Sequence, residues 1–270
     1  MRRLLNGMTM VDVAIERLTT FGAAALAKHP DGYYLAFSGG KDSVAILGLA
    51  KEAGVKFTAH HNLTTCDPPE LVRFIKTFPQ VAIHIPRETM WQLVRRMGMP
   101  PRRQARFCCQ VLKEGGGAGR VVLTGVRAGE SNRRSKRQYI EPCMRDGSRT
   151  YLHPIFDWST QDVWDYIRER GLSYCSLYDE GWKRLGCVLC PMTRDVERQM
   201  NRWPKIAAAW ERAVKATFKP DKVGFATAEE YWQWWLDRDA PSRASAEPTM
   251  FDDDGAESAI AADAKAGVQT

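Results

Sequence analysis

Short apolar runs and segments with helical periodicity alternate along the first two thirds of the chain. The apolar runs have the length of buried strands and span residues 33–37, 55–59, 81–85, 121–124 and 151–155. Apolar residues recur at helical spacing in the segments 8–28, 44–52, 70–78 and 88–97, and again after residue 157. Strands that alternate with helices predict an α/β fold, in which helices cover both faces of a parallel sheet.

The pattern changes in the last third of the chain. Residues 196–218 and 228–237 are predicted to form helices, and the second contains three tryptophans that are expected to pack rather than to stack on bases: Trp232, Trp234 and Trp235. From residue 241 the chain is too poor in apolar residues to fold alone. We therefore expect an α/β domain at 1–195, a helical extension at 196–240 that packs on it, and a disordered acidic tail at 241–270.

Composition and charge narrow the class of protein. The 270 residues are 44% hydrophobic and 26% charged, as in soluble globular chains, and no apolar run is long enough to span a bilayer. The first ten residues lack a sustained apolar stretch, so no secretory signal is expected and a cytoplasmic location is predicted. Seven cysteines in that compartment favour thiols or metal ligands over disulfides. A formal net charge of +7 favours nucleotides or nucleic acid as partners.

A glycine-rich hexapeptide separates the first predicted strand from the helical segment that follows it. Its residues are Ser38, Gly39, Gly40, Lys41, Asp42 and Ser43. A strand, a turn and a helix in this order aim backbone N–H groups and a helix N-terminus at one point, which favours an anion. Two glycines let the backbone approach a phosphate closely, and the lysine adds positive charge. The motif differs from the Walker loop, GxxxxGK[ST]. It predicts a phosphate-binding site.

Four of the seven cysteines have the spacing of metal ligands, as Cys108-Cys109 and Cys187-x-x-Cys190. A CxxC turn holds two thiolates near one metal centre, and the second pair completes four ligands. Adjacent residues diverge by about 100° on a helix, so the pair suits the separate corners of an iron–sulfur cluster better than one zinc ion. Zinc and four unrelated buried cysteines remain as alternatives. The other three are expected to be bystanders: Cys66, Cys143 and Cys175.

Several motifs together resemble one superfamily. The hexapeptide is similar to the pyrophosphate loop SGGxDS of the N-type ATP pyrophosphatases, among the adenine nucleotide alpha-hydrolases. The cysteine pattern resembles the 4Fe–4S signature of the adenylyl sulfate reductase branch of the phosphoadenylyl sulfate (PAPS) reductase family. Further segments resemble that family: Gly125-x-Arg127-x-x-Glu130-Ser131-x-x-Arg134, His153-Pro154-Ile155-x-x-Trp158, Asp162-Val163-Trp164-x-Tyr166-Ile167 and Leu177-Tyr178-Asp179-x-Gly181 through Gly186-Cys187. The resemblance covers roughly residues 30–200. It implies a Rossmann-like sheet whose domain, 1–195, binds an adenine nucleotide.

Two departures from the sulfonucleotide reductases refine the expected function. Those enzymes carry a catalytic cysteine in a C-terminal tail, whereas this sequence has no cysteine after Cys190. Their pyrophosphate loop tends to be altered, whereas SGGKDS is intact here. The combination looks closer to the reductase-like ATP pyrophosphatases, including the component of DNA phosphorothioation systems that pairs such a loop with an iron–sulfur cluster. This resemblance implies an enzyme that activates an acceptor with ATP, releases pyrophosphate and then introduces sulfur.

The resemblance also implies roles for particular residues. Lys41 and the backbone donors of the loop would stabilise the leaving pyrophosphate, Asp42 would hold Mg²⁺ or orient the loop, and Arg127 would clamp phosphate or acceptor with Arg133, Arg134 or Arg137. The expected catalytic residues are Lys41, Asp42 and Arg127. The expected nucleotide-binding residues are Ser38, Gly39, Gly40, Lys41, Asp42, Ser43, Gly125 and Arg127. The expected cluster ligands are Cys108, Cys109, Cys187 and Cys190. Three histidines are expected to be structural: His60, His61 and His153.

Two further hypotheses stay open beside ATP-dependent sulfur transfer. The first is a reductase of adenylyl sulfate or PAPS that takes thiols from a partner protein. The second is a non-catalytic nucleotide- or nucleic-acid-binding module, which the basic runs at 95–96, 102–106 and 133–137 would suit. The leading hypothesis expects a 4Fe–4S cluster, ATP and Mg²⁺. It also expects nucleic acid as the acceptor, a sulfur-donor or thiol-reductant protein as a partner, and no membrane.

Overall fold

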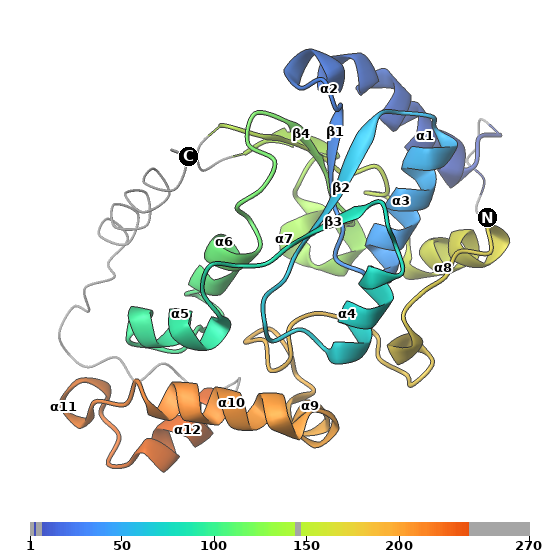
Figure 1. The fold of residues 1–270 in the computed structure, drawn as a ribbon. Helices are drawn as coiled ribbons and strands as arrows, with labels where there is room; N and C mark the ends of the chain where they lie inside the picture. Colours follow the sequence, from blue (N-terminus) through green and yellow to red (C-terminus); the bar gives the residue numbers. More distant parts are fainter. Residues whose placement is uncertain (1–2, 4–6, 144–146, 238–270) are drawn as a thin grey trace. The chain divides into compact units, whose positions relative to one another are not determined.

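The computed structural model describes residue 3 and residues 7–143 and 147–237 (Figure 1). These residues form two compact units. The first comprises the described residues of Met1–Met90 together with Arg106–Cys190, and the second comprises Trp91–Ala105 with the described residues of Pro191–Thr270. The expected domain limits at 195 and 240 stay predictions, and the expected tail at 241–270 lies outside the described residues. Among the described residues, no helix is both long and apolar enough to cross a bilayer.

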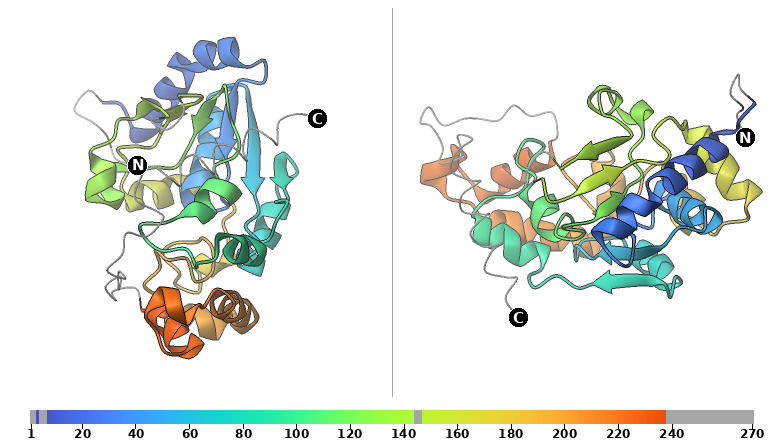
Figure 2. Two further views of the ribbon diagram at one scale, coloured as in Figure 1. Left: turned by 90° about the vertical axis from the view of Figure 1, so that its left-hand side faces the viewer. Right: turned by 90° about the horizontal axis from the view of Figure 1, so that it is seen from above.

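The first unit is built on a six-stranded sheet with the order β3-β2-β1-β4-β6-β5. Its parallel strands are β1 (Tyr33–Ala36), β2 (Phe57–Asn62), β3 (Val81–His84), β4 (Val121–Leu123) and β6 (Thr150–Leu152). The sequence did not predict β5 (Ile140–Pro142), which pairs antiparallel with β6 at the edge of the sheet. Figure 2 shows teal β3 and the green strands at opposite edges. The sheet and its helices form a Rossmann-like α/β fold, so the predicted fold class is confirmed.

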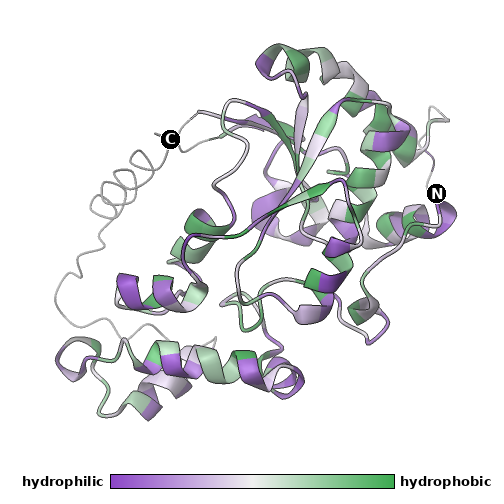
Figure 3. Ribbon diagram, viewed as in Figure 1, coloured by the Kyte–Doolittle hydropathy of each residue, from purple (hydrophilic) through white to green (hydrophobic). Residues whose placement is uncertain are grey.

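The helices of the first unit pack against the central strands of its sheet, which are the buried ones. The expected helix 8–28 is two helices, α1 (Met10–Thr20) and α2 (Gly22–Lys28), because Phe21 leaves helical geometry. Against the sheet lies α3 (Lys41–Glu52), which also packs on α1 and on α8 (Thr160–Glu169) (Figure 1). Figure 3 shows mainly hydrophobic colours on α3, in agreement with its buried apolar residues. Ser159 caps α8 and forms a capping box with Asp162.

The strand order places the predicted phosphate loop at the centre of the sheet. The chain passes outward from β1 through α3 to β2 and through α4 (Pro69–Lys76) to β3, and then returns to β4 after α6 (Phe107–Leu112). Because such crossovers are right-handed, the reversal puts the connections of β1 and β4 on opposite faces and opens a crevice at their carboxyl ends. The segments 38–43 and 124–127 follow these two strands directly. Both predicted nucleotide segments therefore lie at the topological switch point.

The second unit has an aromatic core of its own. Its helices are α5 (Met90–Met97, of which Met90 belongs to the first unit), α9 (Val196–Arg202), α10 (Pro204–Lys215), α11 (Pro220–Val223) and α12 (Ala228–Leu236). Trp210 contacts Trp91 edge-on and Trp235 at centroid distances of 5.0 and 4.8 Å. Trp232 and Trp235 are buried, which confirms the predicted packing role. The expected helix 196–218 breaks because Pro204 has no N–H to continue α9, yet suits the first position of α10.

Candidate functional site

The loop 38–43 is held in shape by its own serines and by one tyrosine. The Ser43 hydroxyl donates to the Gly40 carbonyl at 2.8 Å and accepts from the Ser38 N–H at 3.2 Å. Helix α3 begins at Lys41, whose backbone N–H donates to the hydroxyl of Tyr178 at 2.9 Å. Tyr178 comes from the 3₁₀ turn η2 (Ser176–Tyr178). A tyrosine oxygen therefore lies against the helix N-terminus, where an anion is favoured.

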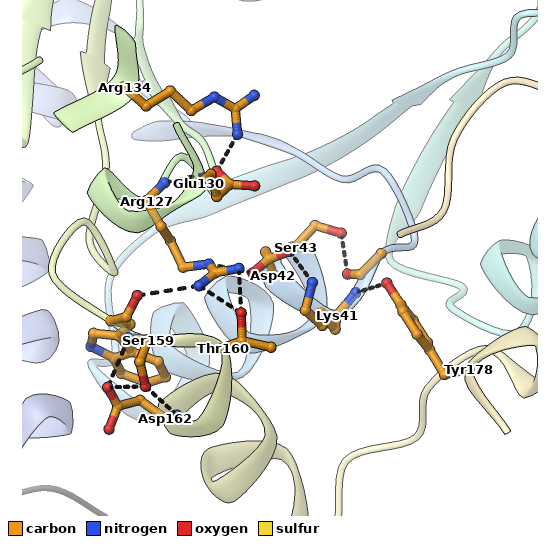
Figure 4. Close-up of polar contacts among 12 residues, drawn as sticks. Lys41, Asp42, Ser43, Arg127, Glu130, Arg134, Ser159, Thr160, Asp162 and Tyr178 are labelled. Atoms are coloured by element: carbon orange, nitrogen blue, oxygen red, sulfur yellow. Dashed lines mark hydrogen bonds and ion pairs between the residues drawn. The ribbon is translucent and has the colours of Figure 1, made fainter. Parts of the chain in front are cut away.

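Three charged side chains join the two predicted nucleotide segments (Figure 4). The carboxylate of Asp42 accepts from Lys41 Nζ at 3.0 Å through one oxygen and from Arg127 Nε at 2.8 Å through the other. Lys41 and Arg127 are 6% and 4% exposed, so this pairing lies largely out of water. Gly125 permits the approach, because a Cβ there would lie 2.8 Å from the Cβ of Asp42. The structure thus brings together the three residues that the sequence predicted to be catalytic.

Arg127 is fixed from the side opposite Asp42. Its guanidinium donates to the Trp158 carbonyl at 3.2 Å and to the Thr160 hydroxyl at 3.3 Å, at the start of α8. Its backbone N–H donates to Glu130 in the 3₁₀ turn η1 (Ala128–Glu130). These contacts direct the Nε edge of Arg127 at Asp42. No local pattern predicted the contact with Thr160, because the two residues are far apart along the chain.

The other arginines expected at the site have different surroundings. Arg134, on α7 (Asn132–Ser135), pairs with Glu130, and Arg137 pairs with Glu141 on β5. Arg133 is exposed, and α7 is hydrophilic in Figure 3. A role for these arginines as a phosphate or acceptor clamp stays a prediction.

The four predicted cluster ligands lie within electrostatic reach of one another. Cys108 and Cys109 are on α6, whereas Cys187 and Cys190 are in the loop that follows Gly186. The Cys108 thiol donates to Cys109, and this hydrogen bond, burial and the charges of Cys109, Cys187 and Cys190 raise the pKa of Cys108. The same hydrogen bond lowers the pKa of Cys109. The arrangement favours a thiolate at Cys109, and a thiolate is the form that binds metal.

Three groups outside the predicted ligand set interact with Cys187. Cys66, predicted to be a bystander, is fully buried and hydrogen-bonded to Cys187, which lowers the pKa of Cys187. The Thr64 hydroxyl lies 3.4 Å from Cys66 Sγ and 3.3 Å from Cys187 Sγ. The charge of Cys187 raises the pKa of the Lys113 ammonium group. No local signal in the sequence distinguishes Cys66 or Lys113 from other residues of their type.

The donor set suits an iron–sulfur cluster in its chemistry. Within the described residues, no three His, Cys, Asp or Glu side chains are arranged around a single metal ion. A mononuclear zinc site needs four ligands within about 2.3 Å of one ion, whereas a cluster binds each thiolate at a different iron and spreads the sulfurs more widely. Four thiols, two of them with lowered pKa, and a nearby ammonium group fit the charge of such a cluster.

Two of the histidines are held by the sheet. His61 is 5% exposed and donates through Nδ1 to the Phe37 carbonyl at 2.9 Å, while its buried Nε2 has no hydrogen-bond partner among the described residues. His60 stacks on Tyr34 and lies 2.9 Å from His84, ring nitrogen to ring nitrogen. Burial first, and then the charge of His84, lowers the pKa of His60 to about 4. Both contacts agree with the structural role expected from the sequence.

Comparison with known proteins places this architecture in a family. The model of the phosphoadenosine phosphosulfate reductase domain matches residues 32–193. An uncharacterised protein of Methanocaldococcus jannaschii is 26% identical over 222 residues, which cover 74% of this chain and 45% of that protein. The adenosine 5'-phosphosulfate reductase of Oceanobacillus iheyensis is 28% identical over 145 residues, or 50% of this chain and 60% of the enzyme. The chain thus spans only about half the length of these relatives.

One solved structure was compared with the fold of this chain. The phosphoadenylyl-sulfate reductase of Candida auris, in a phosphate complex, aligns with a TM-score of 0.47 and 18% identity, covering 69% of this chain and 97% of that one. The family model matches more than half of this chain and includes the loop, the Arg127 segment and all four cysteines. The chain belongs to the phosphoadenosine phosphosulfate reductase domain family.

Proposed function

We propose that the first unit binds ATP at the switch point and uses it to activate an acceptor, with release of pyrophosphate, before sulfur is transferred. The observation that carries this proposal is the bridge from Lys41 through Asp42 to Arg127, at distances of 3.0 and 2.8 Å. It links both nucleotide segments at the N-terminus of α3, which is the place where this fold class holds phosphate. An intact SGGKDS loop supports ATP over a sulfonucleotide as the ligand.

The proposed chemistry is displacement at the α-phosphorus. An acceptor atom forms a bond to that phosphorus, while the bond to the oxygen that bridges the α- and β-phosphates breaks. Negative charge then develops on the departing pyrophosphate, where donors fixed in advance stabilise it most. The backbone N–H of Lys41 and its ammonium group would supply such donors once the phosphates displace Tyr178 and Asp42 from them.

Asp42 acts in this proposal as an organiser of cations. Its carboxylate already accepts from Lys41 and from Arg127. A triphosphate that enters with Mg²⁺ would compete with Asp42 for Lys41 and Arg127. Both cations would then exchange one anionic partner for another and would remain paired throughout binding. Direct contact of Asp42 with Mg²⁺ is compatible with this exchange.

The cysteine group would hold a 4Fe–4S cluster through Cys108, Cys109, Cys187 and Cys190. When bound, the cluster would supply either an iron site for the sulfur in transit or electrostatic support. Lys113 would offset the negative charge of the thiolates, and Thr64 would orient Cys187. A nucleic-acid acceptor and a sulfur-donor or thiol-reductant protein stay predictions.

A sulfonucleotide reductase is the second candidate. The family match and relatives named as adenosine 5'-phosphosulfate reductases favour it. Such an enzyme would use the same loop and cysteines, together with a catalytic thiol that residues 191–270 do not supply. The two candidates differ in the nucleotide that binds more tightly.

Replacing Lys41 by alanine is expected to weaken ATP binding about 10- to 100-fold. A charge-assisted hydrogen bond contributes about 1.5–3 kcal/mol, and the Lys41 side chain is almost fully buried beside Asp42. Isothermal titration with a non-hydrolysable ATP analogue and Mg²⁺ measures the change. Lys51→Ala, an exposed position on the same helix, is the matched control. Equal affinities of Lys41→Ala and wild type would remove the loop from the site.

Replacing Tyr178 by phenylalanine is expected to tighten binding of inorganic pyrophosphate about three- to tenfold. The Lys41 N–H donates to the hydroxyl of Tyr178, although a phosphate oxygen would need the same donor. Wild-type protein must therefore break a hydrogen bond of about 0.5–1.5 kcal/mol before it binds pyrophosphate. Tyr174→Phe is the control, because its hydroxyl donates to Asp179 instead. Weaker binding by Tyr178→Phe would show that the hydroxyl contacts the ligand directly.

A further inference from the structure

Three polar side chains form a hydrogen-bonded chain beside the proposed nucleotide site. Thr124 directly follows β4, His153 directly follows β6, and Glu141 lies on β5. The Thr124 hydroxyl lies 2.7 Å from His153 Nδ1, and His153 Nε2 lies 3.4 Å from Glu141 Oε1. The imidazole of His153 is fully buried, while Thr124 remains partly exposed. The buried ring therefore links two partly exposed ends, Thr124 and Glu141.

The order of these groups fixes the direction of the hydrogen bonds. An ionised Glu141 can only accept, so His153 Nε2 carries the proton and donates to it. The neutral ring then has a lone pair on Nδ1, which accepts the single proton of the Thr124 hydroxyl. With its proton committed, the oxygen of Thr124 has only lone pairs to offer. It can accept a hydrogen bond from a ligand but cannot donate one.

The surroundings keep His153 neutral. Burial first, and then the charges of Arg137 and Arg134, lowers the pKa of His153 to about 4. Arg137 also pairs with Glu141, which holds that carboxylate in place. The other groups that face the ring are Tyr151, at a centroid distance of 6.4 Å, and Phe156, at 6.4 Å. Neither ring makes a hydrogen bond to Nδ1 or Nε2 in the described residues, whereas a hydrogen bond with the Thr124 backbone raises the pKa of His153.

Thr124 also lies close to the phosphate loop. Its backbone N–H donates to the Leu152 carbonyl at 3.1 Å, which continues the pairing of β4 with β6 beyond the last strand residue. The next residue, Gly125, is packed against Asp42, and Arg127 follows two residues later. Thr124 therefore directly precedes the residue that packs against Asp42 of the Lys41–Asp42–Arg127 bridge.

We propose that Thr124, held by His153 and Glu141, is a specificity-determining residue that accepts a hydrogen bond from an N–H or O–H group of the bound adenine nucleoside. The donors that such a ligand carries are the amino group of adenine and the two ribose hydroxyls. The proposal rests on the proposed function, since it requires a nucleotide in this crevice. It assigns the side chain that selects the nucleoside, whereas the loop holds the phosphates.

The test compares four triphosphates on two variants, in the presence of Mg²⁺. The ligands are ATP, 2'-deoxy-ATP, 3'-deoxy-ATP and purine riboside triphosphate, which lacks the amino group. In wild type, the analogue without the donor that Thr124 reads is expected to bind about 5- to 10-fold more weakly than ATP. Thr124→Val is expected to bind that analogue and ATP equally, and Thr124→Ser is expected to discriminate as wild type does. The proposal would be overturned if every analogue lost the same affinity, relative to ATP, in Thr124→Val as in wild type.

This outcome is distinguishable from failure of the proposed function. If wild type binds no ATP, or if Lys41→Ala binds it equally well, the nucleotide site itself is wrong and the role of Thr124 falls with it. If ATP binds and Lys41→Ala weakens it, but Thr124→Val leaves all discrimination unchanged, only the role of Thr124 is wrong.

A measurement on unliganded wild type tests the basis of the proposal without a variant. Nitrogen-15 NMR of the imidazole reports which ring nitrogen carries the proton, and assignment uses the spectrum of His153→Gln. We expect His153 to be protonated at Nε2 and unprotonated at Nδ1 at pH 7. In Glu141→Gln, whose amide can donate, we expect the other tautomer to be populated and the analogue discrimination to weaken at least threefold. A proton on Nδ1 in wild type would overturn the proposal.

Discussion

Cys187→Ser purified without oxygen is expected to lack the iron and acid-labile sulfide that we expect in wild-type protein purified in the same way. A serine hydroxyl matches the shape of the thiol but is a hard ligand with a much higher pKa, so it replaces a thiolate poorly at iron. The surroundings of Cys187 stabilise a thiolate, because Cys66, Thr64 and Lys113 all interact with its sulfur. Loss of this ligand is therefore expected to remove the cluster altogether.

The neighbouring cysteine supplies the matched control. Cys66 is hydrogen-bonded to Cys187 and fully buried, yet the proposed ligand set does not include it. Cys66→Ser is expected to retain its iron, as is Cys143→Ser, whose residue lies next to β5. Iron and sulfide analysis, with the visible absorption spectrum, measures all three variants. Unchanged iron in Cys187→Ser, or loss of iron only in Cys66→Ser, would contradict the ligand assignment.

Gly39→Ala is expected to destabilise the first unit by about 3 kcal/mol. Gly39 has a φ of +74°, a region that costs a residue with a Cβ about 1–2 kcal/mol. A Cβ there would also lie 2.6 Å from Ile75 Cγ1 and 2.8 Å from Leu71 Cδ1, and overpacking of this kind costs about 1–3 kcal/mol. Both side chains are buried on α4 and have little room to move. The substitution is expected to displace the loop from α4.

Gly40→Ala provides a control one residue away. Gly40 has a φ of −77° and its added Cβ would meet nothing closer than 3.4 Å, so a change of less than about 1 kcal/mol is expected. Native-state hydrogen exchange of amides in β1 and α3 resolves the stability of the first unit from that of the second. Equal protection in the two variants would mean that the loop does not have the conformation described here.

The parts of the fold that the sequence predicted are those with local signals. The apolar runs located the five parallel strands, although β2 extends to Asn62, beyond the predicted residues 55–59. Ser159 and Asp162 have the spacing of a capping box at the start of α8. The loop 38–43 was recognisable because its glycines and charges are contiguous. By contrast, β5 is three residues long and contains Pro142, so it has neither the length nor the pattern of a strand.

The contacts that complete the site depend on tertiary structure, and the sequence could not predict them. Tyr178 reaches Lys41, and Thr160 reaches Arg127, from segments distant along the chain. Cys66 meets Cys187 only because residues 64–67, beyond the end of β2, lie near the cysteine loop. An isolated cysteine lacks the CxxC or CC spacing that predicts a metal ligand, which is why Cys66 was expected to be a bystander.

Equilibrium nucleotide binding to anaerobic protein tests whether ATP, rather than a sulfonucleotide, is the ligand of the site. The measurement compares a non-hydrolysable ATP analogue with Mg²⁺ against adenylyl sulfate, and it requires no knowledge of the acceptor. We expect the ATP analogue to bind more tightly than adenylyl sulfate, and its affinity to depend on Lys41 and Arg127. Tighter binding of adenylyl sulfate would contradict it and would favour a sulfonucleotide reductase that uses an external thiol.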